Sequence, residues 1–176
     1  TYSSRGTPIA PIIRIASGDD RPTSQPNVAF SPDGRQLVVA WTDPSIDPPP
    51  AVNDDAGRAG VVAQILTDRF AEVAPAIHLN QFVAGAQSLT TVAGRADGSF
   101  LVAWQSGAEQ DGSGTGIFGR AIETNTDPNE PERRFNQRAT GNQSCPSLAF
   151  APSGRGIAVW QEERSGADRV IARLLT

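Results

Sequence analysis

Three copies of one hairpin-like pattern constrain what this 176-residue chain can fold into. Each copy has an apolar run, a turn of the type Pro-Asp-Gly, Ala-Asp-Gly or Pro-Ser-Gly, and a second apolar run that ends in tryptophan. The tryptophan follows the turn glycine by seven, six and six residues, in the pairs Gly34–Trp41, Gly98–Trp104 and Gly154–Trp160. Internal repetition of this kind is typical of solenoids, propellers and other repeat architectures.

The similarity between the copies continues beyond each tryptophan. A polar loop follows, and then a further apolar run at residues 60–66, 116–122 and 169–175. Short apolar segments come next at 76–79 and 134–136. Each copy therefore predicts four short antiparallel strands bounded by Gly, Pro, Asp and Ser. Sustained helical periodicity is absent from the sequence, so we expect little helix.

The predicted fold is all-β: a β-propeller of three four-stranded blades, in one repeat domain that spans residues 1–176. The blades cover residues 25–80, 88–136 and 145–176, and the third lacks its last strand. An orphan strand at 11–16 precedes the first blade and matches the piece that the third blade lacks. Three blades are too few for a ring, so dimerisation or missing repeats would complete it to six blades. A β-sandwich of similar strand count is the alternative.

Two stretches of the sequence resemble known propeller repeats. Residues 97–106 and 110–120 are similar to repeats of bacterial secreted and surface proteins, with their Val-Ala-Trp-Gln-Ser, Asp-Gly-Ser-Gly and Gly-Ile-Phe elements. Residues 27–39 resemble the blade motif of TolB-type and WD40-like propellers. The resemblance is specific in the second copy and looser in the others. It implies a propeller fold and a secreted, periplasmic or cell-surface location.

Composition excludes several classes of function. The net charge of −4 and the pI of about 4.9 argue against nucleic-acid binding. A single cysteine excludes an intrachain disulfide and a cysteine-based zinc cluster. No apolar run approaches the length of a membrane-spanning helix, so we expect no membrane insertion. The chain has no methionine, even at position 1, so we expect a processed mature protein or an excised segment.

These features favour a non-catalytic binding or scaffold module of adhesin-like or structural type, and not an enzyme. We expect its partners to be a second copy of the chain, neighbouring repeats of a larger assembly, or a glycan. In the first alternative, the protein is a carbohydrate-binding lectin. The candidate ligand-binding residues are then the three tryptophans and two neighbouring amides, Trp41, Trp104, Trp160, Gln105 and Gln161. Packing between blades is the competing interpretation of the tryptophans.

Acidic residues concentrate in the loops that follow the tryptophans. These loops and those between blades would form the ligand-binding face of a propeller, opposite the tight glycine turns. Carboxylates in such loops suit Ca²⁺, for which the candidate ligands are Glu109, Asp111, Asp54 and Asp55. The spacing of a dedicated calcium loop is absent, so solvated acidic turns are the competing interpretation, and no cofactor is certain.

A glycoside-cleaving propeller enzyme is the second functional alternative. Such an enzyme needs two positioned carboxyl groups, which a pair such as Glu109 and Glu162 could supply. The Ser-x-Asp-x-Gly-x-x-Trp turn of sialidases is absent. Serine-histidine-aspartate chemistry would depend on His78, the single histidine, which we expect on the outside of a blade.

Overall fold

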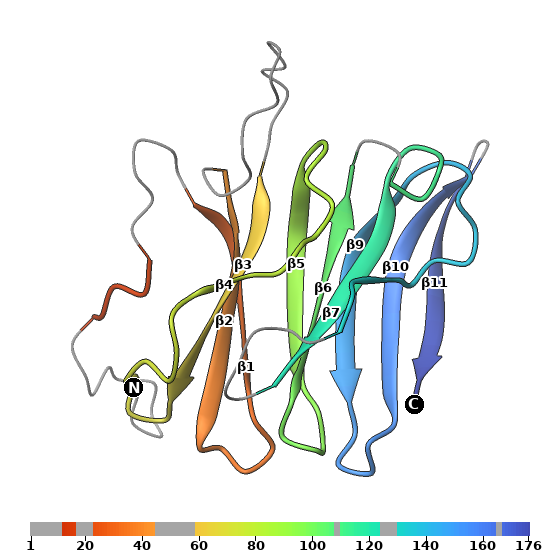
Figure 1. Cartoon of the computed structure of the whole chain (residues 1–176). Coiled ribbons are helices and arrows are strands. Elements are labelled where there is room, and N and C mark those ends of the chain that lie inside the picture. The colour runs from red at the N-terminus through yellow and green to blue at the C-terminus, as the bar shows by residue number, and fades with distance from the viewer. Residues whose placement is uncertain (1–11, 17–22, 45–58, 108–109, 124–129, 165–166) are drawn as a thin grey trace.

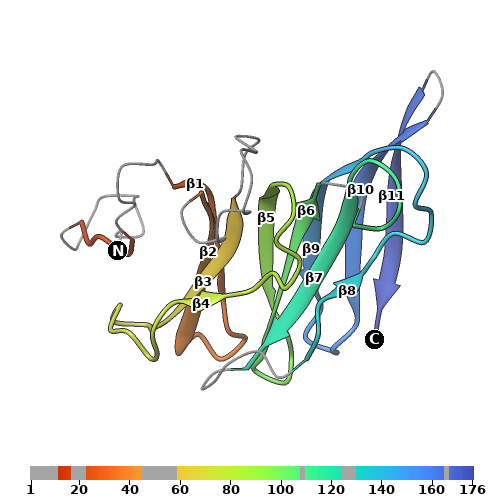
Figure 2. The same cartoon turned by 45° about the horizontal axis from the view of Figure 1, so that its top comes forward.

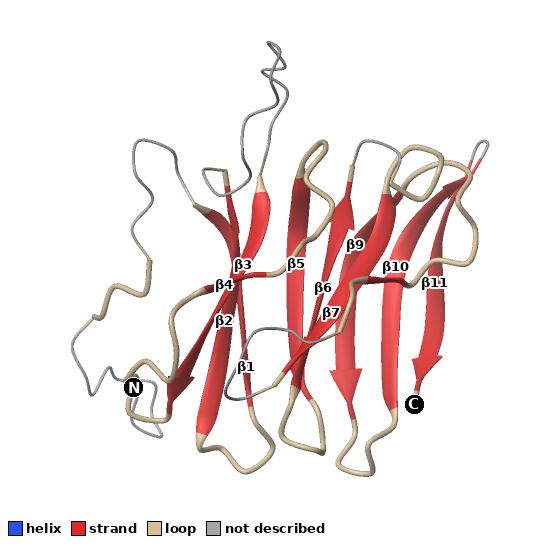
Figure 3. Ribbon diagram, in the orientation of Figure 1, coloured by secondary structure: helices blue, strands red, loops and turns tan. Residues whose placement is uncertain are grey.

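The computed structural model describes residues 12–16, 23–44, 59–107, 110–123, 130–164 and 167–176 (Figure 1). Within these ranges the chain forms strands, turns and loops and no helix, as Figure 3 shows. None of the described residues belongs to a helix that could span a membrane. The eleven strands pair in three separate antiparallel sheets, which confirms the all-β prediction.

The first sheet has the strand order of the chain, β1-β2-β3-β4. Its strands are β1 (Ser24–Phe30), β2 (Gln36–Asp43), β3 (Gly60–Thr67) and β4 (Ile77–His78). The second sheet repeats this order with β5 (Gln87–Gly94), β6 (Phe100–Ser106), β7 (Gly116–Ile122) and β8 (Arg133–Arg134). The third sheet has three strands, β9 (Gln143–Phe150), β10 (Gly156–Arg164) and β11 (Ala167–Leu175). β11 is therefore an edge strand, whereas β3 and β7 each have a fourth strand beside them.

Tight turns connect the first two strands of every sheet. The turn glycines have positive φ values of 70°, 87° and 83° at Gly34, Gly98 and Gly154, which glycine adopts without the steric cost that a Cβ would add. In the second turn the backbone N–H of Arg95 donates to the carbonyl of Ser99, four residues on. In the first turn Ser31 donates to Gln36, five residues on. This extra residue explains why Trp41 follows its glycine by seven residues instead of six.

The three sheets stack face to face, one after another in chain order (Figures 1 and 2). One apolar cluster lies between the first and second sheets and includes Val38, Ile65, Phe100 and Trp104. Another lies between the second and third sheets and contains residues such as Ile117 and Trp160. Alternating residues of each strand therefore face opposite neighbours, and the middle sheet is covered on both sides.

The first strand of each sheet carries the same irregularity. Gln25, Leu89 and Cys145 have φ values of 55°, 53° and 54°, in the left-handed region that residues other than glycine seldom adopt. At each of them the pairing register with the next strand shifts by a bulge. The backbone conformation at this position is therefore repeated in all three sheets, although the three residues differ in size and polarity.

The sheets form part of a propeller-like arrangement and do not close into a ring. Figure 1 shows the first sheet and β11 at opposite ends of the stack. The predicted strand at 11–16 is described from residue 12, and residues 12–16 lie outside any strand. Ile12 is fully exposed there. The outer edge of β11, the last strand of the third sheet, lies at the other end of the stack (Figure 1).

Candidate functional site

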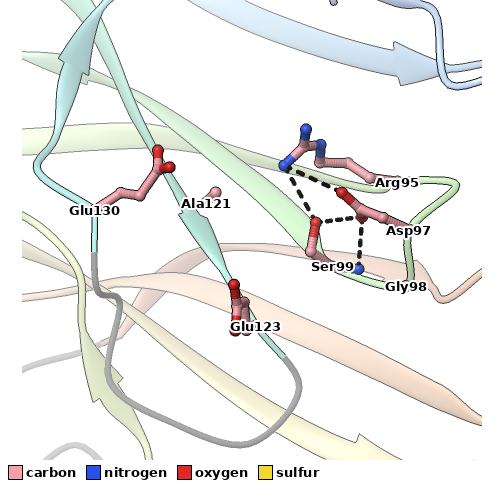
Figure 4. Close-up of a pocket in the computed structure, with 7 residues that line it drawn as sticks. All are labelled: Arg95, Asp97, Gly98, Ser99, Ala121, Glu123 and Glu130. Atoms are coloured by element: carbon pink, nitrogen blue, oxygen red, sulfur yellow. Dashed lines mark hydrogen bonds and ion pairs between the residues drawn. The ribbon is translucent and has the colours of Figure 1, made fainter.

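A surface pocket of about 260 Å³ lies at one end of the second sheet (Figure 4). The turn between β5 and β6, the end of β7 and Glu130, three residues before β8, form its walls. Its lining residues are Arg95, Asp97, Gly98, Ser99, Ala121, Glu123 and Glu130. Strand pairing thus brings three carboxylates and one guanidinium, from three separate segments of the sequence, around one hollow.

Asp97 is held firmly at one side of this pocket. Its Oδ1 accepts hydrogen bonds from the Oγ of Ser99 at 2.6 Å and from the Ser99 backbone N–H at 2.9 Å. The guanidinium of Arg95 lies 3.7 Å from its other oxygen and also donates to the Ser99 Oγ at 3.3 Å. These contacts, the Ser99 hydroxyl first, lower the pKa of Asp97 below its usual 3.8. Asp97 therefore remains ionised at neutral pH.

The two glutamates come from the opposite wall. Glu123 directly follows β7, and Glu130 stands three residues before β8; both are exposed. In Figure 4, Glu130 lies on one side, Asp97 on the other, and Glu123 in the interval between them. The Glu130 carboxylate is 3.1 Å from a guanidinium nitrogen of Arg133, which holds it at the pocket rim.

A second pocket of about 280 Å³ adjoins the first and shares Arg95, Ala121 and Glu130 with it. Its other lining residues include Arg120 and Arg173, at matching places on β7 and β11. Arg120 donates to the carbonyls of Glu130 and Leu79, at 2.6 and 3.1 Å. Arg173 donates to the carbonyl of Phe135 at 2.7 Å. These two arginines therefore tie each sheet to the preceding one.

Both pockets lie on the side of the glycine turns. From the sequence we predicted the ligand-binding face on the other side, at the loops that follow the tryptophans. Among the described acidic residues of those loops, Glu163 accepts from Asn142 Nδ2 at 2.6 Å. Asp168 accepts from Gln161 Nε2 at 2.8 Å. The structure therefore gathers a different set of carboxylates from the one that the loops suggested.

The three tryptophans are buried. The exposed fractions of Trp41, Trp104 and Trp160 are 6%, 0% and 4%. Trp104 packs in the cluster between the first two sheets and Trp160 in the cluster between the last two. Their indole nitrogens are buried without an acceptor among the described residues. This arrangement favours packing between sheets and leaves no ring face open for a sugar.

The neighbouring amides, Gln105 and Gln161, occupy equivalent positions but differ in their contacts. Gln161 is bonded to Asp168, whereas the Oε1 of Gln105 is buried without a donor among the described residues. The structure brings neither amide into the two pockets described above.

Of the four predicted calcium ligands, the structure describes Asp111 alone. Asp54, Asp55 and Glu109 lie outside the described residues. Asp111 accepts at its Oδ2 from the Nδ2 of Asn136 at 2.5 Å, a contact that anchors its loop. Groups of three or more metal-ligating side chains are absent from the described part of the chain. A Ca²⁺ site at these residues remains a prediction. The suggested pair of Glu109 with Glu162 also remains one, because Glu162 is described and buried in β10 but Glu109 lies outside the described residues.

A repeated amide network, which the sequence did not lead us to predict, joins the segment after the fourth strand of one sheet to the first strand of the next. Asn136 accepts from the backbone N–H of Ile117 at 2.9 Å and donates to the Oε1 of Gln143 at 2.8 Å. Asn80 does the same with Val61, at 2.7 Å, and Gln87, at 3.2 Å. The signal was present in the sequence, because each asparagine precedes its glutamine by seven residues.

Comparison with known proteins gives a fold and no family. No protein-family model matches the sequence, and no curated protein matches it. A search of solved structures finds an endo-arabinase from Bacteroides thetaiotaomicron VPI-5482, with a TM-score of 0.57 and 12% identity, over 99% of this chain and 64% of that one. It also finds a thermostable family-43 glycoside hydrolase, with a TM-score of 0.51 and 11% identity, over 86% of this chain and 53% of that one. This chain thus spans less than two thirds of each neighbour.

Both neighbours are five-bladed β-propeller enzymes, which supports a propeller-like fold over the β-sandwich alternative. Both are enzymes by name, which contradicts our prediction of a non-catalytic binding or scaffold module that is not an enzyme. The prediction failed because it relied on the absence of a sequence motif. Glycoside cleavage requires only two carboxyl groups at a suitable separation, which distant segments can supply without any motif.

Proposed function

We propose that this protein cleaves glycosidic bonds in a polysaccharide and that Asp97, Glu123 and Glu130 form its acidic centre. The observation that carries the proposal is the pocket that these three carboxylates share. Glycoside hydrolysis uses two carboxyl groups, one to protonate the leaving oxygen and one to assist attack or stabilise positive charge. The likeness in fold to glycoside-cleaving propellers supports the same chemistry.

Asp97 suits the role of the permanently ionised carboxylate. Two hydrogen bonds from Ser99 and the nearby guanidinium of Arg95 fix its orientation and lower its pKa. A fixed negative charge stabilises the positive charge that develops on the sugar ring in the transition state. Asp97 would therefore act as nucleophile or as base, according to its separation from the acid.

Glu123 is assigned the role of general acid, which donates its proton to the leaving glycosidic oxygen. It enters the pocket from the end of β7, facing the turn that carries Asp97 (Figure 4). Glu130 is assigned a positioning role, because its ion pair with Arg133 engages its carboxylate at the rim.

The shape of the site favours a polymer over a single sugar. The acidic pocket continues into the adjoining arginine-lined pocket through the three residues that they share. A chain of sugars could occupy both hollows, whereas one ring would fill only the first. Polymers of this kind occur outside the cytoplasm, in keeping with the secreted, periplasmic or surface location that we propose.

The test is hydrolysis by the purified 176-residue chain. An arabinose polymer is the first substrate, since one neighbour is an endo-arabinase, and polymers of other sugars follow. Release of reducing ends measures the activity. We expect Asp97→Asn and Glu123→Gln each to lower kcat by about 10²- to 10⁴-fold.

Asp33→Asn is the matched control. Asp33 precedes the turn glycine of the first sheet as Asp97 does in the second, and accepts from the Oγ of Ser31 at 2.7 Å, but it does not line the pocket. We expect this variant to retain full activity. An inactive wild-type chain on all polymers, or an Asp97→Asn variant as active as Asp33→Asn, would refute the proposed function.

A further inference from the structure

The exposed edge of β11 points to a partner strand. In the first two sheets a short fourth strand pairs with the third strand, whereas no strand among the described residues pairs with the outer edge of β11. We propose that residues 12–16 of a second copy of this chain pair with β11 and complete the third sheet. An unpaired strand edge can pair with a strand from another chain through backbone hydrogen bonds.

The repeat fixes the register of this pairing. The tryptophan partners on the third strands are Val62, Phe118 and Ile171. Val62 and Phe118 stand opposite His78 and Arg134 of the fourth strands. By the same spacing, Arg14 of the second copy stands opposite Ile171, and Ile13 opposite Ala172.

The residue after each fourth strand supports this register. Leu79 and Phe135 are buried, and their backbone N–H groups donate to the carbonyls of Val61 and Ile117, at 2.8 and 2.7 Å. Ile15 is the equivalent apolar residue, so its N–H would donate to the carbonyl of Val170. The Val170 side chain is 81% exposed in the single chain.

The third strand also provides space for that apolar side chain. A Cβ on Gly119 would lie 2.8 Å from the ring of Phe135, so the ring packs directly on this glycine. The equivalent residues are small in the other sheets as well, Ala63 in the first and Ala172 in the third. Ala172 is exposed and leaves room for Ile15.

The two ends of the stack present complementary apolar faces. On β1, Val28 and Phe30 are 58% and 57% exposed. The third sheet exposes Ile157, Val170 and Leu174, with exposed fractions of 36%, 81% and 66%. The equivalents of Val28 in the other sheets pack against the preceding sheet. Val28 is therefore exposed because none of the described sheets covers that face of the first sheet.

Sequence spacing places both contacts on the same partner. Asn80 precedes Gln87 by seven residues, as Asn136 precedes Gln143, and the equivalent Ala16 precedes Thr23 by seven. A second copy that adds residues 12–16 to β11 therefore brings its own β1 over the third sheet. The exchange is reciprocal in a two-fold dimer, and the resulting six sheets lie within the usual range for propellers.

One departure from the repeat provides a gain-of-function test. Asn80 and Asn136 accept from the backbone N–H groups of Val61 and Ile117. Ala16 at the equivalent position has no such acceptor for Val170. We expect Ala16→Asn to lower the dimer dissociation constant roughly tenfold, through one added hydrogen bond at each of two equivalent contacts.

The loss-of-function variant is Ile15→Pro, which removes the N–H that faces Val170. Arg14→Pro is its matched control, because the N–H of the equivalent His78 position faces away from the third strand. Sedimentation equilibrium should give twice 18.5 kDa for the wild type and Arg14→Pro, and 18.5 kDa for Ile15→Pro at the same concentration. A monomeric wild type, or a dimer unaffected by Ile15→Pro, would overturn the proposal.

Cross-linking tests the register itself, in a Cys145→Ser background that removes the exposed natural thiol. Cysteines at Arg14 and Ile171 would face each other as a close cross-strand pair and form a disulfide-linked dimer. The Arg14→Cys and Arg169→Cys pair is two residues away from the proposed register and should not cross-link. Cross-linking of the second pair in preference to the first would refute the register.

Discussion

Replacing Trp104 with alanine tests whether the repeated tryptophans hold the sheets together. The Trp104 side chain has no exposed surface and packs in the cluster between the first and second sheets. Its indole nitrogen has no acceptor among the described residues, so the substitution removes packing and no hydrogen bond. The loss of stability therefore measures apolar contact alone.

The expected magnitude follows from complete burial. A buried tryptophan replaced by alanine costs about 3–5 kcal/mol in transfer and cavity energy. A domain of this size has a free energy of unfolding of about 5–15 kcal/mol. Trp104→Ala thus removes a large share of the stability. Trp104→Phe keeps most of the volume and also removes the unpartnered N–H, so we expect a loss below about 1.5 kcal/mol.

Urea denaturation followed by circular dichroism measures both variants, at one protein concentration because association would shift the midpoint. Gln137→Ala, at an exposed loop position, is the control and should change the free energy of unfolding by less than about 0.5 kcal/mol. A loss of under about 1 kcal/mol for Trp104→Ala would refute the packing role. Equal losses for the alanine and phenylalanine variants would contradict the attribution to volume.

Two further predictions concern the second sheet. The folded-state pKa of Asp97 lies below its usual 3.8, chiefly through the Ser99 hydroxyl, so its contribution to stability is present above that pH and is lost as the pH falls through the lower folded value. Asp97→Asn should therefore unfold more easily than the wild type in urea at pH 7, by a small margin because the group is exposed, and equally easily in strong acid. Gly119→Ala should cost about 1–3 kcal/mol in the same assay, because the new methyl group would meet the ring of Phe135; an unchanged midpoint would contradict that contact.

The fold was predictable wherever local chemistry repeats. Glycine turns such as that at Gly98, each followed by a tryptophan six or seven residues later, define a hairpin whose two strands must pair. The polar loop and the third apolar run then extend each hairpin into a sheet. The left-handed residues were not predictable, because Gln25, Leu89 and Cys145 share neither size nor polarity. Their conformation follows from the bulge in each first strand and not from residue type.

The acidic site was harder to predict for a different reason. Asp97 belongs to a turn motif, in which an aspartate is expected for turn geometry alone. Glu123 and Glu130 stand in a connecting segment that carries no motif. Only strand pairing between β6 and β7 places that segment beside the turn. Because carboxylates are dense in the longer loops, we predicted the ligand-binding face on the opposite side of the sheets.

Comparison of the three sheets separates what the fold requires from what it does not. Gln64 and Arg120 make the same contact in their own sheets, each to the carbonyl of the residue three before the fourth strand. That residue is Ala74 in the first sheet and Glu130 in the second, so the contact requires no carboxylate there.

The positions of Glu123 and Asp97 are likewise not acidic in every sheet. The position equivalent to Glu123, seven residues after the glycine that opens the third strand, is Thr67 at the end of β3 in the first sheet. Asp97 corresponds to Asp33 in the first sheet but to Ser153 in the third. The repeat folds without the two glutamates and, in the third sheet, without the aspartate. The convergence of all three carboxylates in the second sheet is therefore not explained by the fold, and it is where substitutions should alter chemistry before they alter stability.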